Sequence, residues 1–154
     1  MQRTCKPLVL TVTMAATLVG ALCAIPAAAA DLCFEQAGTR YGVSPLILQA
    51  IAQQESGLNP RALHRNANGT RDIGIMQINS SWLGFLARHH ISEADLLDAC
   101  TNIHVGAWIL GSNFQRMGVS WEAIGAYNAV SPDKRARYAT QVIGRLRHLL
   151  KGAM

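Results

Sequence analysis

Glu55 is the acidic side chain whose place in the sequence most needs an explanation. It follows Ile51 by four residues and Ile47 by eight, so in a helix it continues the face that these apolar residues form. Acids are seldom placed on a buried face, and the last turn of a helix disfavours negative charge. Both effects raise the pKa of a carboxyl, as a general acid working near neutral pH requires. On spacing alone, an ordinary exposed acid near a helix end stays the alternative.

Asp72 is a second acid, 17 residues after Glu55. It ends a polar stretch, residues 59–72, and stands just before Ile73 and Gly74. Two carboxyls that flank a glycosidic bond, one protonated and one ionised, are the usual equipment of a glycosidase. An acid beside a glycine can equally hold a turn. Both interpretations of Asp72 stay open.

Other chemistries fit the sequence poorly. A nucleophilic elbow at Ser56 needs glycine two positions earlier, where Gln54 stands. No glycine loop for phosphate is present. The histidines show no recognised zinc spacing: His64, His89, His90 and His104. We therefore expect neither a metal nor a cofactor.

The segment around Glu55 has clear signals for the two ends of a helix. Ser44 can cap it, Pro45 suits the first position, and Gly57 can end it. The polar stretch 59–72 predicts a surface loop or a small hairpin, and residues 73–78 predict a strand or an extended segment.

Further helices are expected on either side of these segments. An opening helix is predicted over residues 32–41, and a capping box over 92–95 opens a helical region that ends at Gly118. Ser120 can cap a short segment, 121–128. Ser131 and Pro132 open a last helix, whose apolar side is expected to be Ala139, Ile143, Leu146 and Leu150. The prediction is a mainly α protein with one compact domain and at most a small sheet.

The first thirty residues have the layout of a secretory signal. Arg3 and Lys6 precede an uncharged apolar run over residues 8–25, and alanines 28–30 supply small residues for cleavage after Ala30. The expected division is a signal peptide, 1–30, and a catalytic domain, 31–154. A retained membrane anchor is the alternative.

Charge and cysteines agree with export. The chain carries 14 Lys and Arg against 9 Asp and Glu, a net charge of +5, and basic residues gather over residues 134–151. A basic surface suits an anionic polymer, and export argues against nucleic acid; a solvated helix face is the plain alternative. Without the signal, Cys33 and Cys100 remain, and we expect them to form a disulfide rather than stay two buried thiols.

Three motifs then point to one family. Residues 54–60 read QESGLNP, residues 72–79 read DIGIMQIN, and residues 126–128 read AYN. Their order and spacing resemble the lysozyme-like lytic transglycosylases over the whole mature chain. The closest resemblance is to the small transglycosylases attached to secretion, conjugation and pilus machines. It implies a single lysozyme-like domain with a small hairpin or extended segment after the catalytic helix.

The resemblance also implies roles for individual residues. Glu55 is similar to the family's catalytic acid, and Ser56 to the neighbour that steadies acid or substrate. Tyr127 and Asn128 are similar to the pair that orients the acid and contacts substrate. The remaining residues implied to bind the glycan are Met76, Gln77 and Asn79.

The implied reaction is cleavage of the β-1,4 bond between N-acetylmuramic acid and N-acetylglucosamine in peptidoglycan, leaving 1,6-anhydro ends. The implied setting is the periplasm, where a monomer would open the wall for a type III, type IV or pilus machine. One departure from the family pattern leaves a lysozyme-type hydrolase as an alternative function. The loop over residues 66–72 is longer and more polar than usual and is similar to that of animal-type lysozymes, which pair two carboxyls as Glu55 and Asp72 would. A wall-binding subunit without activity is the alternative of another class.

Overall fold

The computed structural model describes residues 27–152, and the helix that carries Glu55 has the predicted ends. Helix α2 runs over Pro45–Ser56, with proline in its first turn. Gly57 takes a left-handed conformation (φ 63°), and its N–H donates to carbonyls of the last turn. The side chain of Ser44 does not cap the helix as predicted; its carbonyl oxygen accepts from Ile47 and Leu48 instead.

A disulfide joins two of the helices that form the core. Helix α1 (Ala27–Tyr41) begins five residues before the predicted start, and α4 spans Ala99–Met117. Cys33 of α1 is bonded to Cys100 of α4, which confirms the predicted pair. Asp98 caps α4 by accepting from the N–H of Thr101, and α4 ends at Gly118 as predicted.

The polar stretch after α2 forms the predicted small hairpin. Strands β1 (Leu63–Arg65), β2 (Arg71–Ile73) and β3 (Ile78–Asn79) form an antiparallel sheet in that order. The prediction of a single strand or extended segment over residues 73–78 is wrong. Gly74 (φ 78°) turns the chain, so the two ends of that segment lie in neighbouring strands.

Helix α6 packs against α2, and α5 packs against α4 and α6. Helix α5 (Trp121–Gly125) is shorter than predicted and is capped by Ser120, and α6 spans Pro132–Gly152. The buried face of α6 is made by Tyr138, Ala139 and Val142, with Leu146 and Leu149 partly buried. The prediction that Leu150 belongs to this face is wrong, since it is 45% exposed.

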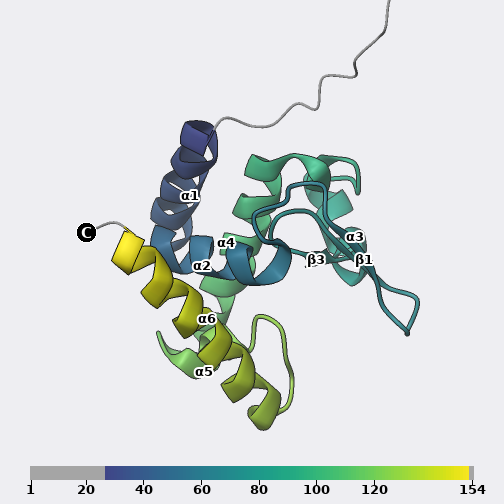
Figure 1. Cartoon of the computed structure of the whole chain (residues 1–154). Coiled ribbons are helices and arrows are strands. Elements are labelled where there is room, and N and C mark those ends of the chain that lie inside the picture. The colour runs from purple at the N-terminus through teal and green to yellow at the C-terminus, as the bar shows by residue number, and fades with distance from the viewer. Residues whose placement is uncertain (1–26, 153–154) are drawn as a thin grey trace, which may run out of the picture.

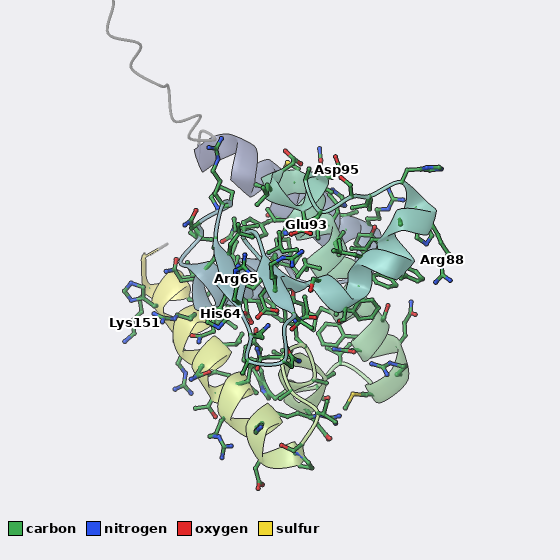
Figure 2. The ribbon with its side chains drawn as sticks, turned by 90° about the vertical axis from the view of Figure 1, so that its right-hand side faces the viewer. His64, Arg65, Arg88, Glu93, Asp95 and Lys151 are labelled. Atoms are coloured by element: carbon green, nitrogen blue, oxygen red, sulfur yellow. A yellow bond between two sulfur atoms is a disulfide. The ribbon has the colours of Figure 1, made fainter. Side chains whose placement is uncertain are left out.

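The other elements lie on two opposite sides of α4. In Figure 1 the sheet and the short helix α3 (Leu83–Leu86) lie on the right, and α1 and α6 lie on the left. An ion pair between Arg71 and Glu93 (2.6 Å) ties β2 to the chain that leads into α4, and Figure 2 shows Glu93 close to Asp95 on this side. Between residues 27 and 152, no helix is both long and apolar enough to span a bilayer. The predicted signal peptide falls outside the described residues except for its last four, which begin α1.

Candidate active site

A cleft of about 1000 Å³ lies where the end of α2, the sheet, α4 and the chain after α5 meet. It holds both acids singled out from the sequence, Glu55 and Asp72. The predicted substrate-binding residues that also line it are Gln77, Asn79, Tyr127 and Asn128. Ser56 and Met76 do not line it.

The carboxyl of Glu55 is largely buried in this cleft. Burial raises its pKa from an ordinary 4.5 to about 7, a hydrogen bond from Tyr138 lowers it, and the negative charge of Asp72 raises it. A carboxyl with this pKa exists in both protonation states near neutral pH. Glu55 can therefore give a proton and take one back in a single reaction.

Tyr138 of α6 is the direct partner of the acid. Its hydroxyl donates a hydrogen bond to Oε1 of Glu55, and only 5% of the residue is exposed. Burial raises the pKa of Tyr138, so it stays a neutral donor. Tyr138 was not among the residues predicted from the sequence. The signal available was its place on the buried face of α6, four residues before Val142.

Tyr127 packs beside Tyr138, the residue that bonds to the acid. Its ring lies nearly parallel to that of Tyr138, with centroids 6.5 Å apart and an angle of 16° between the planes. Its hydroxyl donates to the carbonyl oxygen of Met76 (2.9 Å). Tyr127 thus stacks beside the hydrogen-bond partner of Glu55 and gives its own hydrogen bond to the backbone, and its part in orienting the acid stays a prediction.

Replacing Tyr138 with phenylalanine is expected to lower kcat/KM roughly tenfold, the value of one hydrogen bond to a charged group. The pKa of Glu55 should rise because the contact that lowers it is lost. The alkaline limb of the pH–rate profile should therefore move to higher pH. Tyr41→Phe, at the end of α1, is the matched control and should leave the profile unchanged. A downward shift for Tyr138→Phe would contradict the assignment.

Asp72 is held in place by two side-chain amides. Nδ2 of Asn66 donates to Oδ2 (2.9 Å), and Nδ2 of Asn79 donates to Oδ1 (2.6 Å). Both amides also donate to Oγ1 of Thr70. Asp72 thus fastens the hairpin to β3 and also places a negative charge that acts on Glu55.

The side chains of Ser56 and Gln77 are held by hydrogen bonds to backbone carbonyls. Oγ of Ser56 donates to the carbonyl of Ile75 (2.7 Å), and this bond fixes the end of α2 to the turn after β2. Nε2 of Gln77 donates to the carbonyl of Gly74 (2.8 Å). Asn128 is exposed at the cleft.

Met76 has a different place from the one predicted. Its side chain is fully buried, and it packs so closely on Gly106 of α4 that a Cβ there would lie 2.8 Å from its terminal methyl. The Met76 side chain therefore does not line the cleft, and the role of this segment in binding the glycan stays a prediction. Its backbone contributes instead, through the carbonyl that accepts from Tyr127.

Asn102 is a second residue that the sequence analysis missed. It is fully buried in α4, and its Oδ1 accepts from the N–H of Met76 (2.7 Å). Its Nδ2 donates to the carbonyls of Ile73 and Leu96, both at 2.8 Å. One side chain thus holds the turn between β2 and β3, which forms a wall of the cleft.

A second cavity of about 750 Å³ shares Phe85 and Trp108 with the cleft. These two rings stack with centroids 4.9 Å apart. None of the residues that line the second cavity is acidic, so it lacks a group for glycosidic acid catalysis. Among the described residues, no three His, Cys, Asp or Glu side chains come together as metal ligands.

Comparison with known proteins gives one family for this arrangement. Residues 32–141 match the model of the transglycosylase SLT domain. The chain is 43% identical to the invasion protein IagB of Salmonella typhimurium over 122 residues, 76% of each chain. It is 40% identical to protein IpgF of Shigella flexneri over 129 residues, 80% of this chain and 85% of the other. It is also 36% identical, over 126 residues, to a peptidoglycan-binding-like protein of Escherichia coli O157:H7, 74% of this chain and 75% of the other.

The family explains the cleft, its buried acid and the mainly helical fold together. The match extends from α1 into α6, so it includes both Glu55 and its partner Tyr138. The chain belongs to the SLT transglycosylase family and is a lytic transglycosylase, an enzyme that cleaves glycosidic bonds of peptidoglycan.

Proposed function

We propose that Glu55 cleaves the β-1,4 bond between N-acetylmuramic acid and N-acetylglucosamine and leaves a 1,6-anhydro end. The protonated carboxyl gives its proton to the bridging oxygen, and the acetamido oxygen of the muramyl sugar bonds to the anomeric carbon as the glycosidic bond breaks. Glu55, now a carboxylate, takes the proton of the 6-hydroxyl. The 6-oxygen then displaces the acetamido oxygen and closes the anhydro ring.

The observation that carries this proposal is the burial of the Glu55 carboxyl in the cleft against Tyr138, which raises its pKa to about 7. The mechanism asks one carboxyl to serve first as acid and then as base, and such a pKa lets it do both near neutral pH. Tyr138 supports the second step because its hydroxyl can stabilise the carboxylate between the two proton transfers.

The contacts of Asp72 favour this mechanism over the hydrolase. Each of its carboxylate oxygens already accepts from an asparagine amide, so the group is fixed in the sheet. Each oxygen keeps a free lone pair, so what favours the structural role is this anchoring together with the family match, and not a loss of nucleophilicity. We assign Asp72 the roles of holding the cleft wall and keeping the pKa of Glu55 high.

Asp72→Asn is expected to lower activity only modestly, by less than about tenfold, and to leave 1,6-anhydro ends as the main product. The pKa of Glu55 should fall because the nearby negative charge is gone. The alkaline limb of activity should therefore move to lower pH. Mass spectrometry of the muropeptides released from purified sacculi reads the product, since an anhydro end is one water lighter than a reducing end.

Asp133→Asn, an equal change of charge on an exposed residue of α6, is the control. Reducing ends as the main product of the wild-type enzyme, with a nearly inactive Asp72→Asn variant, would show instead that Glu55 and Asp72 work as a lysozyme-type pair.

We further propose that the enzyme acts in the periplasm and opens the wall for a secretion, conjugation or pilus apparatus. Its similarity to a protein named for invasion supports a link to export machinery. The test is export by cells that lack the protein and carry either the wild type or Glu55→Gln. Equal export by both strains would favour a wall-binding subunit whose activity does not matter.

A further inference from the structure

Arg116 is the only cation among the residues that line the cleft. It lies in the last turn of α4, on the part of the lining that also includes Ser112 and Asn113. Figure 2 shows two other basic side chains, Arg88 and Lys151, projecting outward from opposite sides of the molecule.

The guanidinium of Arg116 is held by its own helix. Nη2 donates to Oδ1 of Asn113, and Nε donates to the carbonyl of Ser112 (3.4 Å). Asn113 is only 4% exposed and is itself anchored to the carbonyl of Ala123. A guanidinium has five N–H donors, so three remain for a ligand.

No acidic side chain satisfies this charge within the described residues. The ion pairs there join Arg71 to Glu93 and Arg135 to Glu122. Glu55 and Asp72 line the same cleft, but their bonds go to Tyr138 and to two asparagines. An oriented guanidinium with free donors is well suited to a carboxylate, which it can bind through two parallel hydrogen bonds.

We propose that Arg116 binds a carboxylate of the peptide stem on the muramyl sugar and so selects strands whose stems are acidic. The inference rests on the proposed function, since it takes peptidoglycan as the substrate of the cleft. The sugar rings and their acetamido groups are uncharged, whereas the peptide substituents carry free carboxylates. A muramyl sugar stripped of its peptide carries one carboxylate too, on its lactyl group, and the experiment separates these two sources.

The test compares three glycan strands: strands with acidic stems, the same strands with their carboxyls converted to amides, and strands stripped of peptide by an amidase. Arg116→Gln is expected to raise KM about tenfold on acidic stems, with little change in kcat, because one charge-assisted contact is lost. On amidated strands the variant and the wild type should be alike. On stripped strands they should also be alike, since the lactyl carboxylate lies closer to the sugar than the stem carboxylates do. Arg116→Lys should restore part of the loss.

Arg137→Gln is the matched control, because Arg137 is exposed on α6 and does not line the cleft. An equal effect of Arg137→Gln would attribute the change to net charge and overturn the proposal. It would also be overturned if Arg116→Gln raised KM equally on acidic and amidated stems, or only on stripped strands. The mass of the released ends tests the proposed function separately, since Arg116 has no part in forming the anhydro ring.

Discussion

Glu55→Gln is expected to reduce cleavage of peptidoglycan by about a hundredfold or more, with the fold unchanged. The amide can still accept the hydrogen bond from the hydroxyl of Tyr138, so the side chain keeps its place. It can neither give a proton to the glycosidic oxygen nor take one from the 6-hydroxyl. Release of labelled fragments from sacculi measures the loss, and a pull-down with the same sacculi should show binding retained.

Glu35→Gln removes an exposed carboxyl from α1 and serves as the control, with activity equal to that of the wild type. Turnover by Glu55→Gln at the wild-type rate would remove Glu55 from the mechanism. A general loss of both binding and cleavage would point to a folding defect, which circular dichroism of the same sample detects.

The same substitution should change how stability depends on pH. The pKa of Glu55 is about 7 in the folded protein against an ordinary 4.5, so the folded state binds more protons between these values. The contribution of Glu55 to the free energy of unfolding should therefore be largest below pH 4.5 and should be lost as pH rises toward 7. The shift corresponds to on the order of 3 kcal/mol. Glu55→Gln lacks this dependence, and urea unfolding of both proteins at pH 4.5 and pH 8 measures the difference.

Asn102→Leu is expected to destabilise the protein by about 3 kcal/mol or more. The substitution keeps a side chain of similar size but leaves the N–H of Met76 and the carbonyls of Ile73 and Leu96 without their partner in the core. A buried polar group that loses its partner destabilises the fold by its full desolvation penalty, which is larger than the net contribution of the hydrogen bond. The loss in the free energy of unfolding should therefore exceed that of three ordinary hydrogen bonds. Urea unfolding with the disulfide intact measures it.

Gln115→Leu makes the same change of amide to alkyl group at an exposed position of α4 and should alter stability by about 0.5 kcal/mol or less. Equal stability of Asn102→Leu and the wild type would show that the turn between β2 and β3 is held by other contacts. The folded fraction of Asn102→Leu should also cleave more slowly, because this turn forms a wall of the cleft.

Local signals in the sequence predicted the elements whose ends depend on nearby residues. Pro45 and Gly57 mark the ends of α2 because their backbone preferences act within one turn. The hairpin after α2 follows from a polar, glycine-containing stretch, and the disulfide follows from the two cysteines that lie outside the predicted signal. The prediction for residues 73–78 was wrong because it took loose alternation for one strand, whereas Gly74 turns the chain there.

The sequence by itself determined which carboxyl we assign to the chemistry and which helix presents it, since Glu55 lies on the apolar face of a helix whose ends are locally coded. Only the tertiary structure decided how that carboxyl is tuned. Its hydrogen-bond donor, Tyr138, is separated from it by 83 residues, and its pKa depends on burial by elements from both halves of the chain. Asn102 could not be identified for the same reason, because its partners Met76 and Ile73, on the turn after β2 and at the end of β2, lie 26 and 29 residues away. Hydrophobic periodicity predicts which face of a helix is buried. It does not predict which polar group of another element packs against that face.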